Sequence, residues 1–167
     1  MTIVRASYSN TARWAHQYLA TFAPGPGHPG RRLWSHDGAP RSLAAARALV
    51  DRARRPRLFY ALTISPDPDT EDGPQDLDLQ DLTERTLRVL ARRLTRPLDW
   101  VAAEDHEHGR WRHVHVLVVS PRRLLAAELA LLSWAATAAA EAQRRDLDAR
   151  SRPAPSSVPL EEAVLWP

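Results

Sequence analysis

The sequence predicts an α+β fold with a central, mostly antiparallel sheet and helices packed on it. Two strand-like segments, 98–104 and 112–120, lie close enough along the chain to form a hairpin. A third, 57–65, is rich in strand-forming residues and is closed by Pro66 and Pro68. Segments with helical periodicity flank these strands, and this mixture is typical of helices packed on a sheet.

The first part of the chain predicts a short strand, a helix and a loop. Residues 2–5 form the strand. Residues 9–22 form a helix, with Asn10 as the N-cap and an apolar stripe of Ala15, Leu19 and Phe22. The many Pro and Gly residues of 23–40 predict a loop there.

Three further helices are expected. One spans 41–54, with Ser42 near its start, and one is an amphipathic helix over 79–94. The apolar positions of the second are Leu79, Leu82, Leu87, Leu90 and Leu94. A long Ala/Leu helix covers 122–147. We expect one domain over 1–150 and a flexible tail over 151–167.

The composition excludes several classes of protein. The 167 residues contain no cysteine, which excludes disulfides and thiolate metal sites and favours a reducing cytoplasm. The sequence contains no run of eighteen apolar residues, so no membrane span is predicted. The N-terminus lacks the apolar region of a signal peptide. Any metal must therefore be held by His, Asp or Glu.

All 23 basic residues are arginines, and the net charge is only +3. Acidic residues concentrate in 66–81, so a basic face can coexist with this modest charge. Arginine suits phosphate and base binding because its planar fork is bidentate and stacks on rings. Arg- and Ala-rich chains are also common products of GC-rich genomes.

The stretch 104–120, "EDHEHGRWRHVHVLVVS", carries four of the seven histidines. Because side chains alternate along a strand, His113 and His115 share one face, about 7 Å apart. Val114, Val116 and Val118 face the core on the other side. His106, at the end of the preceding strand, is the expected third metal ligand, and His108 is a surface residue of the turn. Glu104 and Asp105 are expected as partners behind the ligands.

The spacing of His106, His113 and His115 resembles the metal-binding motif of the HUH endonucleases. It is most similar to the conjugative, mobilisation and T-DNA-border relaxases. "RLFYALTISPDP" and "LTERTLRVLARRL" followed by "LDWVAAEDH" resemble the elements that precede that motif, so the similarity covers roughly residues 3–147.

The resemblance implies a metal-dependent DNA nickase and strand transferase. Such an enzyme would act on single-stranded DNA or a DNA hairpin at the origin of transfer of a mobile element, with accessory proteins of a relaxosome. A tyrosine would attack the scissile phosphate and form a 5′-phosphotyrosine link. The resemblance favours Mg²⁺ or Mn²⁺ as the cofactor, whereas three imidazoles by themselves favour metals such as Zn²⁺.

The chain has three tyrosines, Tyr8, Tyr18 and Tyr60. Relaxases place the nucleophile near the N-terminus, so the resemblance favours Tyr18, with Tyr8 as the alternative and Tyr60 as a sheet residue. No tyrosine lies in 122–147, which disfavours the replication-initiator and small-transposase branches.

Arg110, Trp111 and Arg112, beside the histidines, are the expected DNA contacts. Glu107, His108 and Gly109 depart from the residues usual after the first histidine in relaxases. Three other interpretations therefore stay open: a relaxase-like fold that binds DNA without nicking it, a metal hydrolase that uses water, and purely structural histidines.

Overall fold

The computed structural model describes residues 1–24, 31–36, 38–53, 57–105 and 111–152. The predicted α+β class is confirmed, because the described residues form one antiparallel sheet and four helices. The strands are β1 Ile3–Ser9, β2 Leu33–Trp34, β3 Pro40–Arg41, β4 Leu58–Ser65, β5 Asp99–Asp105 and β6 His113–Ser120. The helices are α1 Ala12–Ala20, α2 Leu43–Arg52, α3 Leu79–Arg93 and α4 Ala126–Ser151.

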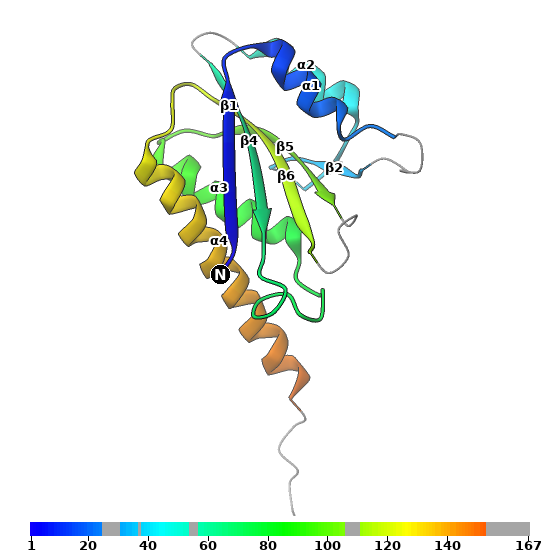
Figure 1. Cartoon of the computed structure of the whole chain (residues 1–167), viewed down its shortest axis with the longest axis vertical. Coiled ribbons are helices and arrows are strands. Elements are labelled where there is room, and N and C mark those ends of the chain that lie inside the picture. Colours follow the sequence, from blue (N-terminus) through cyan, green and yellow to red (C-terminus); the bar gives the residue numbers. More distant parts are fainter. Residues whose placement is uncertain (25–30, 37, 54–56, 106–110, 153–167) are drawn as a thin grey trace, which may run out of the picture.

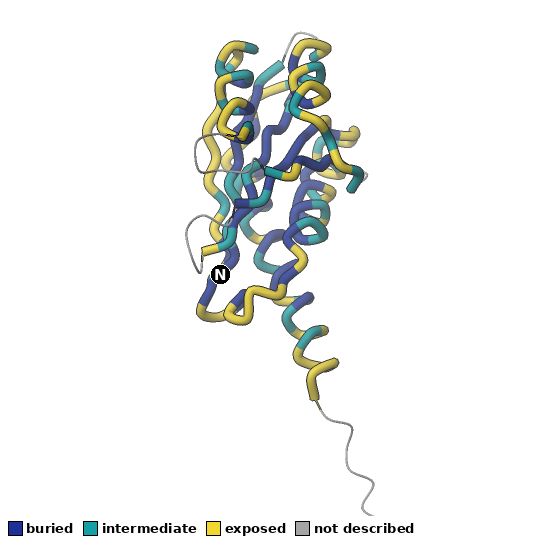
Figure 2. Tube along the Cα trace, turned by 90° about the vertical axis from the view of Figure 1, so that its right-hand side faces the viewer, coloured by how far each residue is buried: buried dark blue, intermediate teal, exposed yellow. Residues whose placement is uncertain are grey.

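The sheet has the order β1-β4-β6-β5-β2-β3, and each neighbouring pair is antiparallel. Helices cover both of its faces: α3 and α4 lie on one side, and α1 and α2 lie on the other (Figure 1). Figure 2 shows buried segments gathered in the middle of the molecule, between outer layers with more exposed residues. The strands at the centre of the sheet, β4 and β6, are buried along most of their length because both of their faces are covered. The result is a three-layer sandwich.

Two apolar clusters form the core, one on each face of the sheet. The valine row of β6 packs with the leucines of α3 and with α4, and its members are Val114, Val116 and Val118. On the other face, Leu117 packs with Leu19 of α1 and Val50 of α2. The predicted alternation along β6 is therefore confirmed, since the two sets of side chains enter different clusters.

Several elements differ in their boundaries from the sequence-based expectation. β1 runs to Ser9 because its second half pairs with β4, with Tyr8 opposite Tyr60. The N-cap of α1 is Thr11, not Asn10, and the Thr11 hydroxyl accepts a hydrogen bond from the Trp14 backbone N–H. The segment predicted as a loop, 23–40, contains β2 and the first residue of β3, and these short strands form by pairing with β5 and with each other.

The last helix begins later than predicted, at Ala126, and continues to Ser151. The residues before it follow the end of β6: the Leu124 backbone N–H donates to the Tyr60 hydroxyl at 2.8 Å, and the Ser120 hydroxyl donates to the Arg122 carbonyl. These bonds hold the segment in a non-helical path. Residues 153–167 of the predicted tail lie outside the described part of the chain.

Among the described helices, none combines the length and apolar character that a membrane crossing requires.

Candidate metal centre

The candidate site lies where β5 ends and β6 begins. The register of the two strands places Asp105 directly opposite His113, and His115 follows two residues later on the same face. All three side chains lie on the side of the sheet that α1 and α2 cover. Asp105 and His113 are buried, and His115 is partly buried.

One potential ligand atom from each of these three residues lies close to the ligand atoms of the other two. His113 Nε2 lies 3.1 Å from His115 Nε2, and the Asp105 carboxylate oxygen Oδ2 lies 3.3 Å from the first and 3.4 Å from the second. Neighbouring ligands of a cation bound at about 2.1 Å are about 3.0 Å apart in octahedral and about 3.4 Å apart in tetrahedral geometry. The Asp105–His113–His115 group therefore has the donor set and the spacing to bind a metal ion.

The Nδ1 atoms of the two histidine rings, which face away from the group, have hydrogen-bond partners that suit metal ligands. His113 Nδ1 lies 3.3 Å from the Trp111 carbonyl, and His115 Nδ1 lies 3.2 Å from the Tyr18 hydroxyl. A proton on each Nδ1 would be donated to these oxygens and would leave both Nε2 lone pairs directed at the Asp105 carboxylate. Metal-binding histidines are usually oriented by such partners.

Tyr18 reaches the site from α1, although 97 positions separate it from His115 along the chain. The helix brings the ring over the sheet, where it stacks on Trp14 at 5.9 Å and contacts Phe22 edge-on. The Tyr18 hydroxyl also lies within 3.5 Å of the Leu62 carbonyl. Burial raises the pKa of Tyr18, and the nearby Arg31 cation opposes that effect in part.

Arg31 is a site residue that the sequence analysis missed. Its guanidinium donates a 2.6 Å hydrogen bond to Asp105 Oδ2, the same oxygen that faces both histidines, and its other nitrogen donates to the Thr21 carbonyl. Arg31 follows a Pro- and Gly-rich segment, and no periodicity or motif distinguishes it from the other arginines. The pairing of β2 with β5, and the hydrogen bond from the Arg31 backbone N–H to the Phe22 carbonyl, bring this segment to the site.

The charge of the site is balanced between one carboxylate and one guanidinium. Burial lowers the pKa of His115, and the adjacent His113 and the Arg31 cation lower it further, which outweighs the opposite effect of Asp105 and favours the neutral imidazole that binds metals.

The other predicted site residues are distributed differently. His106 and Arg110 lie outside the described residues, so the third histidine and this DNA contact stay predictions. Asp105 supplies a donor atom to the group itself and does not lie behind the ligands as expected. Trp111 is 43% exposed at the mouth of the hairpin, as a stacking residue requires.

Arg112 and Glu104 belong to an internal network on the opposite side of the strand pair. Arg112 donates to the Glu104 carboxylate at 2.9 Å, to Asp72 at 3.2 Å and to the Leu77 carbonyl, and its side chain is 11% exposed. These hydrogen bonds attach the acidic segment between β4 and α3 to the sheet. They occupy most of the N–H donors of the Arg112 guanidinium, so few are left for the predicted DNA contact.

The remaining tyrosines lie away from the group. Tyr60 is buried in the cluster that faces α3 and α4, which agrees with its expected place in the sheet. Tyr8 stacks on Tyr60 at 5.3 Å and is covered by Arg123 on its other face. Of the three tyrosines, Tyr18 is the one hydrogen-bonded to a residue of the Asp105–His113–His115 group.

Comparison with known proteins adds no family to this picture: no protein-family model matches the chain, and no curated protein is significantly similar to it.

Proposed function

We propose that the chain is a metal-dependent endonuclease that nicks single-stranded DNA, with Tyr18 as the nucleophile and the Asp105–His113–His115 group as the metal ligands. This is the relaxase-type activity that the sequence resemblance implies. The substrate would be a single strand or hairpin at the origin of transfer of a mobile element.

One observation carries the proposal: the Tyr18 hydroxyl lies 3.2 Å from a ring nitrogen of His115, whose other nitrogen belongs to the candidate metal site. The sequence resemblance independently implies the same tyrosine and the same two histidines. A nucleophile must lie beside the group that binds the scissile phosphate, and residues from α1 and β6 meet that requirement here.

The reaction would exchange one phosphodiester for another. The Tyr18 oxygen would attack the scissile phosphorus and form a P–O bond, while the bond from phosphorus to the 3′-oxygen breaks. The phenolic proton would leave to solvent, and the 3′-oxygen would take up a proton. The products are a free 3′-hydroxyl and a 5′-phosphotyrosine.

The donor set favours a hard divalent cation more than three imidazoles would. A carboxylate is a typical ligand of Mg²⁺ and Mn²⁺, whereas imidazole also suits Zn²⁺. We therefore propose Mn²⁺ or Mg²⁺ as the working ion. When bound, the ion would neutralise and polarise a phosphate oxygen.

A second candidate is a phosphodiesterase that uses water as the nucleophile. It is favoured by the raised pKa of Tyr18 and by the position of its hydroxyl, which is that of a group orienting His115. In this case Tyr18 would be a positioning residue, and no covalent link to DNA would form.

A covalent-adduct assay separates these candidates. The protein is incubated with Mn²⁺ and a 3′-labelled pool of single-stranded DNA of degenerate sequence, and label that migrates with the denatured protein is measured. We expect an adduct with the wild type and with Tyr8→Phe, whose hydroxyl lies outside the site, and no adduct with Tyr18→Phe. An adduct that survives Tyr18→Phe would refute this nucleophile. Strand cleavage without any adduct would select the water mechanism.

Metal binding is tested separately by calorimetric titration with Mn²⁺. One-site binding should be lost in Asp105→Asn and retained in Asp51→Asn, which alters the exposed Asp51–His16 pair instead. Equal binding by the three proteins would refute the proposed ligand set. Binding without cleavage or adduct would favour a DNA-binding module that has lost its catalytic activity.

A further inference from the structure

A cavity lies beside β5 and β6 at the end of these strands opposite to the metal-binding group. It has a volume of about 560 Å³ and is lined by residues at the start of β5 and the end of β6, including Asp99 and Val119. Asp99 and Asp105 are the two ends of β5, six positions apart, which corresponds to about 20 Å along a strand. The cavity is therefore distinct from the site of the proposed cleavage.

Three arginines from different elements line this cavity. Arg52 ends α2, Arg57 precedes β4 and Arg96 follows α3. Among the described residues of the lining, Asp99 is the one acid, so arginines outnumber acids there by three to one. We call this cavity, defined by Arg52, Arg57, Arg96 and Asp99, the arginine pocket.

In the described part of the chain, none of the three arginines of the arginine pocket has a carboxylate partner, and the same holds for some exposed arginines such as Arg88 and Arg92. Within the ranges that the structure describes, no ion pair joins any of them to an acidic residue. By contrast, carboxylates pair with Arg31, Arg85, Arg112, Arg122, Arg144 and Arg145. Arg52 and Arg96 are exposed and Arg57 is partly buried, and a cavity lined mainly by charges of one sign concentrates ions of the opposite sign.

Arg57 supplies an independent sign of a missing partner. Its Nε is buried and has no hydrogen-bond acceptor, whereas its NH1 donates to the Ala53 carbonyl and its guanidinium lies 5.5 Å from the centre of the Phe59 ring. The carbonyl and the ring hold the guanidinium in position. A buried N–H without an acceptor is costly, and a bound anion would satisfy it after a small rotation of the Arg57 side chain towards the cavity.

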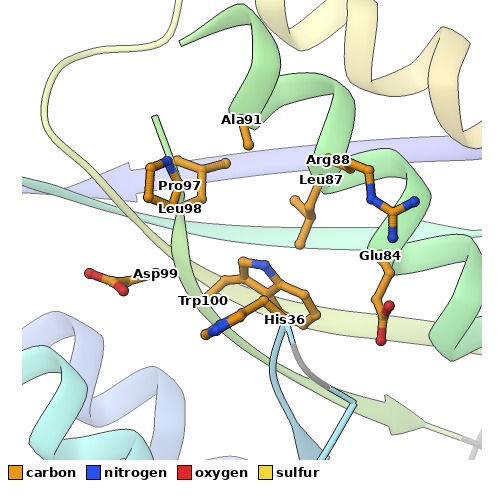
Figure 3. Close-up of a pocket in the computed structure, with 9 residues that line it drawn as sticks. All are labelled: His36, Glu84, Leu87, Arg88, Ala91, Pro97, Leu98, Asp99 and Trp100. Atoms are coloured by element: carbon orange, nitrogen blue, oxygen red, sulfur yellow. The ribbon is translucent and has the colours of Figure 1, made fainter. Parts of the chain in front are cut away.

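The adjacent pocket is different in character. It shares Pro97 and Asp99 with the arginine pocket and has a volume of about 320 Å³. Figure 3 shows its apolar residues, among them Trp100, together with charged groups of both signs, Glu84 and Arg88. This mixture does not select an anion, so Arg88 is a suitable control for effects of charge alone.

We propose that the arginine pocket binds a phosphate of single-stranded DNA, as a second contact for the strand about 20 Å from the metal-binding group. Guanidinium forks match phosphate oxygens, and a basic cavity on the same sheet face can hold a flanking part of a strand. That the ligand is DNA rests on the proposed function, whereas the affinity for phosphate does not.

The test follows the Arg57 Nε–H resonance by nuclear magnetic resonance, first with inorganic phosphate and then with a short oligonucleotide that lacks terminal phosphates. EDTA is present throughout, so the result does not depend on metal binding or on cleavage. We expect each ligand to shift the resonance in a saturable way. The double variant Arg52→Gln/Arg96→Gln, which keeps Arg57, should bind each about tenfold or more weakly, because charge-assisted hydrogen bonds are lost.

The matched control is Arg88→Gln/Arg92→Gln, which removes the same charge from the exposed side of α3. It should keep its affinity. Equal weakening by the two double variants would show an effect of net charge and would overturn the site. A response to inorganic phosphate but not to the oligonucleotide would overturn DNA as the ligand, and no response to either would overturn the pocket as an anion site.

Discussion

Replacement of Arg112 by methionine is the sharpest test of how the hairpin is stabilised. Arg112 lies next to the histidine strand, and the sequence analysis placed it among the DNA contacts. In the structure its guanidinium joins Asp72, Glu104 and the Leu77 carbonyl, and both Arg112 and Asp72 are almost fully buried. Arg112→Met should therefore reduce stability first, and any loss of DNA binding should follow from unfolding.

The size of the effect follows from the exposure of each partner. The Asp72 side chain is 4% exposed, so removal of Arg112 leaves a buried carboxylate without its cation, which costs about 3–5 kcal/mol. The Glu104 side chain is 26% exposed and its pair is partly screened, so its loss adds at most about 1 kcal/mol. We expect a total of about 4 kcal/mol and a fall in Tm of about 8–16 °C for a domain of this size.

Thermal and urea denaturation measure this loss. The control is Arg85→Met, which breaks the exposed pair with Asp81 on α3 and should cost less than about 1 kcal/mol. Adding Asp72→Asn to Arg112→Met should restore about 2 kcal/mol, because it removes the uncompensated charge and keeps an acceptor for the Leu77 backbone N–H. A cost of Arg112→Met no larger than that of Arg85→Met, with DNA binding reduced in the folded protein, would refute this reasoning.

Three further outcomes are expected. Tyr60→Phe removes the acceptor of the buried Leu124 N–H and should lower the free energy of unfolding in urea by about 1–3 kcal/mol; an unchanged value would mean that water replaces the hydroxyl. The Arg122 guanidinium lowers the pKa of Glu128, so this pair stabilises the fold above the ordinary value of 4.5, and the stability is lost as the pH falls through the lower folded value. Glu128→Gln should flatten that acid dependence in denaturation curves, and an unaltered dependence would exclude the pair as its cause. Saturating Mn²⁺, at about 100 times its dissociation constant, should stabilise the wild type by about 2.7 kcal/mol and leave the Tm of Asp105→Asn unchanged; an equal rise in both would contradict the ligand set.

The sequence by itself determined the elements whose signals are local. Alternation along 113–120 requires one face of valines and another of histidines, whatever the rest of the chain does. The leucine period of 79–94 likewise predicts the buried stripe of α3, and Ser42 predicts the start of α2, where its hydroxyl accepts from the Ala45 backbone N–H. These features depend on contacts within a few residues.

Only the tertiary structure decided which residues meet at the site. The β5–β6 register sets Asp105 opposite His113, so that a carboxylate supplies a donor atom beside the two imidazoles. The packing of α1 brings Tyr18 to His115, and the pairing of β2 with β5 brings Arg31 to Asp105. None of these contacts has a local signal, because each joins segments that are brought together by the packing of helices and strands. The same is true of the ion pairs of Arg112 with Asp72 and Glu104, which the sequence did not predict.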